Sequence, residues 1–292
     1  VRPLRAARDA FPSHTVRLVV GQTPGGQTDT MARVLGAHFA TQWGVSVVVE
    51  NVAGAGGLIG GRAVARAVPD GYTLYVGSSA NIAWSAMQSP DAGYDPRVAW
   101  APIGRIGRVA FVLAVRNGLG AGNLREFVAR ARAKSEGVSV ASGGEASNSG
   151  RALRLFERHA GVKVLEVPYK SSYNSVTAVV AGDVDATFCD LAAALPYPGQ
   201  LRLVAQTGAH RSPLAPDLPT FREAGGPDLV LEPWYGLVAP AHTPHDVIAV
   251  IVTALRVALT DPDVARRLAA AGYEVVLDSP DAFAAAIRRE LD

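Results

Sequence analysis

Short segments rich in glycine and hydroxyl residues follow several apolar runs, and they hold the residues best suited to binding chemistry. The first is Gly21–Asp29 (GQTPGGQTD), between an apolar run and a helical pattern. Glycines let the backbone turn tightly, and the first turn of a helix leaves N–H groups unpaired at the positive end of the helix dipole. Such a helix start binds anions without a cationic side chain. A tight turn capped by Thr28 or Asp29 explains the same residues, and both interpretations stay open.

Three further loops share this composition. Residues 54–57 (GAGG) follow the second apolar run, 77–79 (GSS) follow the third, and 142–149 (SGGEASNS) follow a run in the second half of the chain. Loops after parallel strands gather at the carboxyl edge of a sheet, where ligands bind. Because few lysines or arginines accompany them, they favour recognition by main-chain donors, hydroxyls and ordered water.

A dinucleotide-binding enzyme is the main alternative. A strand, a glycine turn, a helix and a second strand ending at Glu50 are typical of such a fold, with Glu50 at the ribose. However, a short-chain dehydrogenase would have a further glycine where Gln27 stands. It would also have a Tyr-x-x-x-Lys motif, whereas Tyr169 and Lys170 are adjacent. An NAD-dependent short-chain-type oxidoreductase remains the alternative function.

Other chemistries find less support. The segment Gly137–Ala141 lacks the last glycine of a nucleophile elbow and is typical of a plain strand. His242 and His245 lie at a predicted helix start, which favours a solvated cap over a metal site. Cys189 is the only cysteine, and we interpret it as a small buried residue of a strand. We therefore expect no catalysis, no cofactor and no metal.

Composition excludes further classes. The formal net charge is +2, and no basic cluster is interleaved with aromatic residues, so nucleic acid is not expected as a partner. The three arginines of Val1–Arg8 indicate a frayed terminus rather than a nucleic-acid arm. No apolar run reaches the roughly 18 to 20 residues of a membrane span.

The apolar pattern predicts the framework that positions the loops. The chain has 292 residues, 49% of them hydrophobic and 18% charged, which favours two well-filled lobes. Short apolar runs alternate with helical patterns, which predicts an α/β fold with mainly parallel sheets covered by helices. Strands are predicted at 16–20, 45–50, 73–76, 111–115, 138–141, 163–167, 184–190, 201–207 and 234–239. One predicted helix spans 123–135. Two late helices are predicted from Thr243 and from Asp261, the first with Thr243 as its N-cap and Pro244 at the first helical position.

The late helices have no obvious sheet of their own, so we expect them to pack against the first part of the chain. The prediction is a first lobe of residues 1–105 with 234–292 and an inserted second lobe of residues 106–233. A ligand cleft would lie between the two lobes.

With these loops placed, the chain resembles the Bug family, the periplasmic receptors of tripartite tricarboxylate transporters. The resemblance runs from about Val16 to the C-terminus and rests on motifs in a fixed order. These are PGG with Asp29, VVEN followed by GAGG, PDGYTL at 69–74, VPYK at 167–170, LPT at 218–220 and WYGL at 234–237.

The resemblance implies a type II periplasmic-binding fold with the ligand cleft between lobes that close by a hinge. It implies a periplasmic receptor, its signal peptide removed, that passes a small carboxylate-bearing metabolite to membrane transporter subunits. The metabolite would be an organic acid, an amino acid or an aromatic carboxylate, and the receptor a monomer. The resemblance places the binding site in segments 23–29 and 142–149, at the end of the third strand, in the loop after Lys170 and at Asp190. The individual ligand-binding residues carried over are Thr23, Pro24, Gly25, Gly26, Thr28, Asp29, Ser78, Ser79, Ser142, Gly143, Ser147, Asn148, Ser149 and Asp190.

The sequence departs from the family pattern near this site. Ser171 stands where glycine is common, Glu145 and Asn148 where small residues are frequent, and Gly150 where histidine is common. These changes leave the ligand open.

Two carboxylates near the cleft bear on the ligand. A buried carboxylate without a partner carries a desolvation penalty, so Asp190 favours an amino acid over a purely anionic ligand such as citrate. Lys170 could instead neutralise Asp190. The simpler interpretation is that Glu145 projects into solvent and that Asp190 caps the next turn.

Overall fold

The computed structural model describes residues 11–133, 137–145 and 147–291. The arginine-bearing segment 1–8 and residues 134 and 135 of the predicted helix lie outside them. The first part of the chain forms β1 (Val16–Val20), α1 (Gln27–Trp43), β2 (Val47–Asn51), η1 (Ala55–Gly57), α2 (Leu58–Ala65), β3 (Thr73–Ser78), η2 (Ala80–Trp84), α3 (Ser85–Gln88) and β4 (Trp100–Val109). The middle forms β5 (Phe111–Arg116), η3 (Asn117–Leu119), α4 (Leu124–Ala133), β6 (Val138–Ser142), α5 (Asn148–Ala160), β7 (Val164–Pro168), α6 (Ser172–Ala181), β8 (Ala186–Asp190), α7 (Leu191–Ala194) and β9 (Leu201–Gln206). The last part forms β10 (Trp234–Pro240), α8 (His245–Thr260), α9 (Pro262–Ala270), β11 (Tyr273–Val275) and α10 (Pro280–Leu291).

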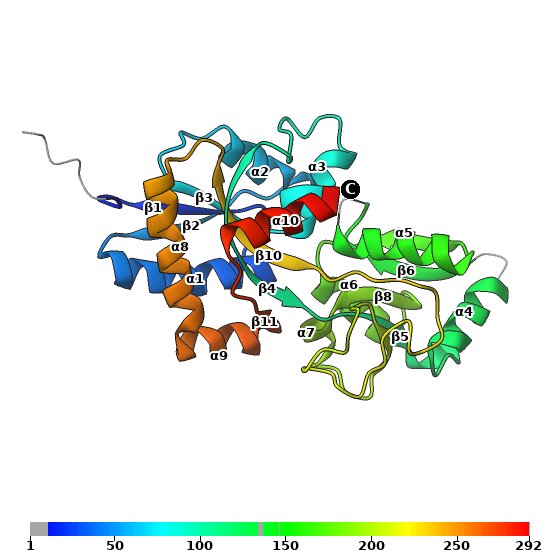
Figure 1. The fold of residues 1–292 in the computed structure, drawn as a ribbon. Helices are drawn as coiled ribbons and strands as arrows, with labels where there is room; N and C mark the ends of the chain where they lie inside the picture. Colours follow the sequence, from blue (N-terminus) through cyan, green and yellow to red (C-terminus); the bar gives the residue numbers. More distant parts are fainter. Residues whose placement is uncertain (1–10, 134–136, 146, 292) are drawn as a thin grey trace, which may run out of the picture.

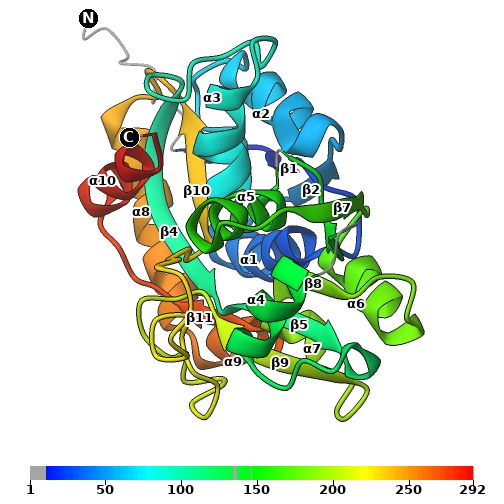
Figure 2. The same cartoon turned by 90° about the vertical axis from the view of Figure 1, so that its right-hand side faces the viewer.

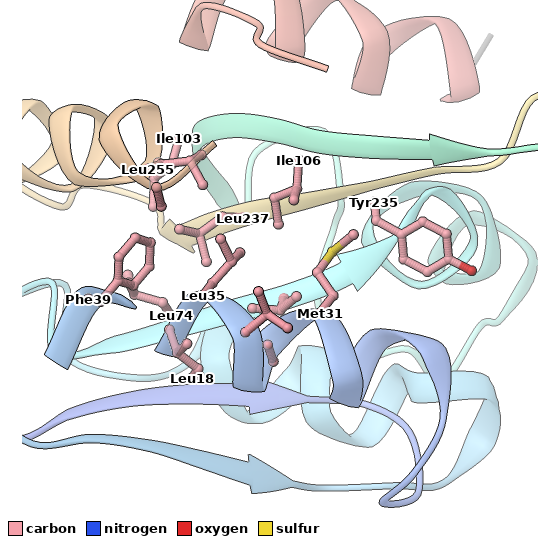
Figure 3. Packing of buried hydrophobic residues seen from close by; sticks show 14 of the residues in the cluster. Leu18, Met31, Leu35, Phe39, Leu74, Ile103, Ile106, Tyr235, Leu237 and Leu255 are labelled. Atoms are coloured by element: carbon pink, nitrogen blue, oxygen red, sulfur yellow. The ribbon is translucent and has the colours of Figure 1, made fainter. Parts of the chain in front are cut away.

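The first sheet has six strands in the order β11-β4-β10-β3-β1-β2. Strand β1 is parallel to β2 and β3, whereas β10 is antiparallel to β3 and β4. The apolar face of α1 covers this sheet, with Met31, Leu35 and Phe39 fully buried (Figure 3). Tyr235 lies at one end of the cluster, and its hydroxyl oxygen points away from it.

The second sheet has five strands in the order β7-β6-β8-β5-β9. Strand β6 is parallel to β7 and β8, and β5 is antiparallel to β8 and β9. Its core holds a chain of aromatic rings from different elements, with centroids 5.7 Å apart for Phe127 and Phe156 and 5.9 Å apart for Phe156 and Phe188. This sheet and its helices form the right-hand part of the molecule in Figure 1.

The predicted α/β class is confirmed, but both sheets are mixed rather than mainly parallel. The antiparallel pairings all involve β4, β5 or β10, strands next to the two crossings between the sheets. Strand β4 was not predicted, because Pro102, Gly104 and Gly107 interrupt its apolar pattern. Two register shifts in the pairing of β4 with β10 lie near these residues.

The start of α8 also differs from the prediction. The helix begins at His245, so Pro244 is the cap residue rather than the first helical residue. The Thr243 hydroxyl donates instead to the carbonyl of Pro240, at 2.8 Å.

The chain passes from the first sheet to the second at Ala110 and returns between β9 and β10. Helices α8 and α10 contact β4, and α9 contacts β11, so the late helices lie on the first sheet (Figure 2). We propose that the two sheets are the cores of two lobes, divided as predicted except that the first crossing lies at Ala110 rather than at residue 106. Strand β4 continues to Val109 before the crossing.

Candidate functional site

A cavity of about 510 Å³ is lined by loops that follow strands of both sheets, between the two proposed lobes. The first lobe contributes the β1–α1 loop, the loop around η1, the end of β3 and Tyr235 of β10. The second lobe contributes the β6–α5 loop, the β7–α6 loop and the end of β8. The glycine- and hydroxyl-rich loops of both lobes therefore meet at one place.

Asp29 stabilises the β1–α1 loop from a position outside the cavity lining. Its carboxylate accepts the Gly25 N–H at 2.9 Å, the Arg33 Nε at 2.9 Å and the Asn51 Nδ2 at 3.0 Å. Burial acts to raise the pKa of Asp29, but these hydrogen bonds and the Arg33 charge outweigh it, so the pKa lies below its usual value. Gly25 has a φ of 80°, a left-handed conformation that favours glycine. Asp29 thus shapes the loop instead of facing the cavity.

Helix α1 begins at the cavity with an open N-terminus. Its cap residue is Gly26, and no side chain caps the helix. Gln27, the first residue of the helix, is 9% exposed and lines the cavity. Within the described residues, its amide nitrogen Nε2 has no hydrogen-bond partner. Its amide oxygen accepts the Tyr235 hydroxyl at 3.2 Å.

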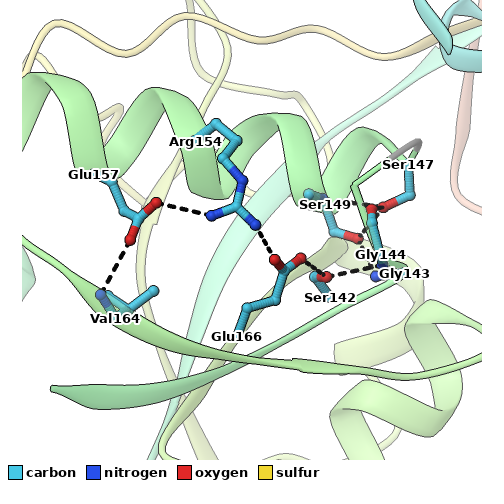
Figure 4. A network of polar contacts seen from close by, with 10 residues as sticks. Ser142, Gly143, Gly144, Ser147, Ser149, Arg154, Glu157, Val164 and Glu166 are labelled. Atoms are coloured by element: carbon cyan, nitrogen blue, oxygen red, sulfur yellow. Dashed lines mark hydrogen bonds and ion pairs between the residues drawn. The ribbon is translucent and has the colours of Figure 1, made fainter. Parts of the chain in front are cut away.

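The β6–α5 loop of the second lobe is held by its own serines (Figure 4). The Gly143 N–H donates to Ser149 Oγ at 2.7 Å, and the Gly144 N–H donates to Ser142 Oγ at 2.9 Å. The Ser147 hydroxyl accepts the Gly150 N–H at 3.0 Å and so caps α5. These hydrogen bonds therefore hold Gly143, Gly144 and Ser147 in a defined arrangement.

Next to this loop, a charged network joins α5 to strands β6 and β7. Ser142 donates a hydrogen bond to Glu166, and Glu166 forms an ion pair with Arg154. Arg154 also pairs with Glu157 at 2.8 Å, whose carboxylate accepts the Val164 N–H at 3.1 Å. Figure 4 shows Ser142 between this network and the loop, which explains why its side chain supports the site from outside the cavity.

Asp190 is a buried carboxylate at the end of β8, and it lines the cavity. Burial raises its pKa to about 6, against the opposing hydrogen bonds from Ser172 and its own backbone. The Ser172 hydroxyl donates to Asp190 Oδ2 at 2.8 Å. Although Asp190 precedes α7, its side chain does not cap that helix. Glu145 is exposed and does not line the cavity.

Eight of the predicted site residues line the cavity: Thr23, Gly26, Ser78, Gly143, Ser147, Asn148, Ser149 and Asp190. The other six, which are Pro24, Gly25, Thr28, Asp29, Ser79 and Ser142, do not line it. The contacts of four of these explain why: Gly25, Asp29 and Ser142 hold the loops as described, and Thr28 donates to the Gln22 amide oxygen at 2.7 Å.

Some residues that line the cavity were not predicted to bind the ligand, among them Phe111 and Tyr235. Tyr235 belongs to the WYGL motif, but nothing in that motif indicates that its ring reaches the start of α1. Gln27 and Ser171 lie in segments that were predicted at the site, the β1–α1 loop and the loop after Lys170, and both line the cavity.

Further contacts join elements of the first sheet to elements of the second. The Ser79 hydroxyl, which follows β3, donates to the Asn148 amide oxygen at 3.2 Å. Arg151 of α5 forms an ion pair with Glu290 of α10, and its guanidinium lies 5.7 Å from the centre of the Trp84 ring. Glu290 also accepts the Trp234 indole N–H at 3.1 Å.

Two findings bear on other functions. Glu50 pairs with Arg17 of the neighbouring strand at 2.6 Å and does not line the cavity, so it is not placed to meet a ribose there. None of the described helices has the length and apolar character needed to cross a membrane.

Two α/β units with a loop-lined cavity between them define a solute-binding protein of the periplasmic type. The sequence model of the tripartite tricarboxylate transporter family receptor, TctC, matches residues 31–291. The chain belongs to this family, and the resemblance to the Bug proteins is confirmed.

Individual relatives agree with this assignment. The chain is 33% identical to the protein BugT of Bordetella pertussis over 276 residues, which cover 94% of this chain and 85% of BugT. The structure of MatC from Rhodopseudomonas palustris with bound malate matches with a TM-score of 0.88 at 31% identity, covering 96% of this chain and 97% of MatC. The R. palustris protein Rpa4515 with adipate matches with a TM-score of 0.88 at 30% identity, covering 96% of this chain and 95% of that protein.

Proposed function

We propose that this protein captures a small carboxylate in the periplasm and passes it to the membrane subunits of a tripartite tricarboxylate transporter. It acts as a monomer and leaves its ligand chemically unchanged. The cavity between the proposed lobes is the binding site.

The observation that carries this proposal is the polarity of the cavity. Two helices, α1 and α5, begin at its wall, and the positive ends of their dipoles favour an anion there. Lys170 also lines the cavity, and it is exposed. A carboxylate is the small anion that backbone N–H groups and an amide side chain bind readily without a cluster of cations. MatC with malate and Rpa4515 with adipate support the same ligand class.

Thermal unfolding in the presence of candidate ligands tests the proposal. A ligand at a hundred times its dissociation constant adds about 2.7 kcal/mol to the free energy of unfolding. We expect stabilisation by at least one of a panel of dicarboxylates, amino acids and pyridine carboxylates, and none by NAD or NADH. Stabilisation by a nicotinamide dinucleotide, with no response to any carboxylate, would favour the oxidoreductase alternative.

A further inference from the structure

A buried hydrogen-bond donor without a partner faces the cavity. Three buried side-chain atoms lack a partner within the described residues, namely Gln27 Nε2, His38 Nδ1 and Tyr273 Oη. Of these three residues, Gln27 is the one that lines the cavity. Leaving such a group unpaired costs free energy, so a buried amide nitrogen at a cavity wall indicates that an acceptor binds there.

The Gln27 amide is held in a defined orientation. Tyr235 reaches it from β10, and the Tyr235 hydroxyl donates to Gln27 Oε1 at 3.2 Å. Burial raises the pKa of Tyr235 well above its usual value, so the hydroxyl keeps its proton and remains a donor. Because the oxygen end of the amide is engaged, the nitrogen end is left to donate to a ligand.

Among the cavity residues that come from the second sheet, Asp190 at the end of β8 offers an acceptor. One hydroxyl, that of Ser172, donates to its carboxylate, and none of the ion pairs between described residues includes Asp190. Lys170 lines the same cavity without pairing with Asp190 in the described residues. The other ionisable groups whose pKa responds to the Asp190 charge all have a raised pKa and are neutral: Tyr173 of α6, Cys189 of β8, Tyr235 of β10 and Tyr273 of β11.

We propose that Gln27 and Asp190 select a ligand that carries both a carboxylate and a hydrogen-bond donor. The Gln27 amide N–H binds the ligand carboxylate, and Asp190 accepts a hydrogen bond from an amino or hydroxyl group of the ligand. The inference rests on the proposed function and names its ligand class, a small carboxylate with a hydrogen-bond donor on its carbon skeleton. The Tyr235 hydroxyl donates to Gln27, and burial together with the charge of Asp190 raises the pKa of Tyr235.

A dicarboxylate without a hydrogen-bond donor should bind less favourably beside Asp190. Its second carboxylate would face the Asp190 carboxylate, so one of the two must take up a proton before they can share a hydrogen bond. A hydroxyl or ammonium group in that position needs no proton. Ligands of equal length therefore differ in affinity and in the number of protons bound.

Isothermal titration calorimetry with matched four-carbon ligands tests the inference. Succinate has no donor, malate has a hydroxyl and aspartate has an ammonium group; homologues of three to six carbons extend each series. The variants are Asp190→Asn and Gln27→Met, with Glu145→Gln as the control because Glu145 is exposed and outside the cavity. Ser172→Ala, which removes the hydrogen bond to Asp190 but keeps its carboxylate, serves as a second variant beside Asp190.

In the native protein, we expect the donor-bearing ligands to bind about tenfold or more tightly than the unsubstituted ones of equal length. Asp190→Asn should abolish this preference, whereas Gln27→Met should weaken every carboxylate about tenfold and keep the preference. Equal affinities within each series, or an equal loss for all ligands in Asp190→Asn, would overturn the inference and leave the proposed function standing. If no carboxylate of any series binds the native protein, the proposed function fails with it.

Discussion

The hydroxyl of Tyr235 lies 3.2 Å from the amide oxygen of Gln27, across 208 positions of the sequence. One residue comes from the strand by which the chain returns to the first sheet, and the other begins the helix after the first strand. The contact ties the strand that enters from the second lobe to the loop expected to bind the ligand. It therefore couples the position of β10 to the orientation of a ligand-facing donor.

Replacing the Tyr235 hydroxyl tests this coupling. Tyr235→Phe keeps the ring, which packs edge-on against Tyr273 with centroids 5.2 Å apart, but frees the Gln27 amide to rotate. We expect about tenfold weaker carboxylate binding, together with a lower midpoint of thermal unfolding because the buried Gln27 amide oxygen loses its donor. Tyr273→Phe is the matched control, because Tyr273 does not line the cavity. Unchanged affinity in Tyr235→Phe would show that the hydrogen bond does not orient the donor.

The charge of Asp190 should lower the stability of the ligand-free protein near neutral pH. Its pKa is raised to about 6 by burial, so the folded protein binds more protons at this site than the unfolded chain does. Stability from this group is therefore greatest at low pH and falls as the pH rises from about 4 to above 6. We expect Asp190→Asn to unfold at higher denaturant than the native protein at pH 7.5, and the difference to shrink toward pH 4.

Urea unfolding of both proteins between pH 4 and pH 8 checks this. Ionisable groups near Asp190, namely Cys189, Tyr173, Tyr235 and Tyr273, have raised pKa values and should not titrate in this range. A constant difference across the whole range would mean that Asp190 does not titrate as described.

Asp29 should behave in the opposite way. Because its pKa is lowered in the folded protein, its charged form stabilises the fold at pH values above the unfolded pKa of about 3.9. That stabilisation is lost as the pH falls through the lower folded pKa. We expect Asp29→Asn to destabilise the protein at pH 7 and to weaken ligand binding, because the Gly25 N–H loses its charged acceptor. Equal urea midpoints for the variant and the native protein at pH 7 would contradict this.

The ion pair between Arg151 and Glu290 should favour the closed form without touching the ligand. Neither residue lines the cavity, and Glu290 also binds the Trp234 indole. Glu290→Gln should lower the apparent affinity roughly tenfold, because a smaller fraction of the protein is closed. Small-angle scattering should show a larger radius of gyration without ligand.

The control for this prediction is Asp263→Asn, which removes an exposed ion pair with Arg266 on α9. It should leave both the affinity and the scattering profile unchanged. If the two variants behave alike, the contact between α5 and α10 is not a closing contact.

Much of the framework could be predicted, because strands and helix starts leave local signals. The loop at 142–149 was predicted beside the cleft from its glycines and serines, and Gly143, Ser147 and Asn148 line the cavity. Strand β4 was missed because Pro102 and its glycines weaken the local pattern, and its place in the sheet comes from pairing with β10 and β11.

Which residues of each loop line the cavity, and which only hold the loop in shape, could not be predicted. Pro24, Gly25 and Asp29 share a motif with Gly26 and Gln27, yet only the last two line the cavity. The Asp29 side chain is engaged by Arg33 from the next helical turn and by Asn51 from the next strand, contacts that the motif does not reveal. Likewise, no local pattern indicates that Tyr235 meets Gln27.

A crystal structure with the tightest-binding carboxylate of the panel tests the central claim most directly. We predict that the ligand lies between the lobes, with a carboxylate oxygen about 3 Å from Gln27 Nε2 and close to the start of α1. A ligand bound outside this cavity, or one whose carboxylate leaves Gln27 Nε2 without contact, would contradict the account.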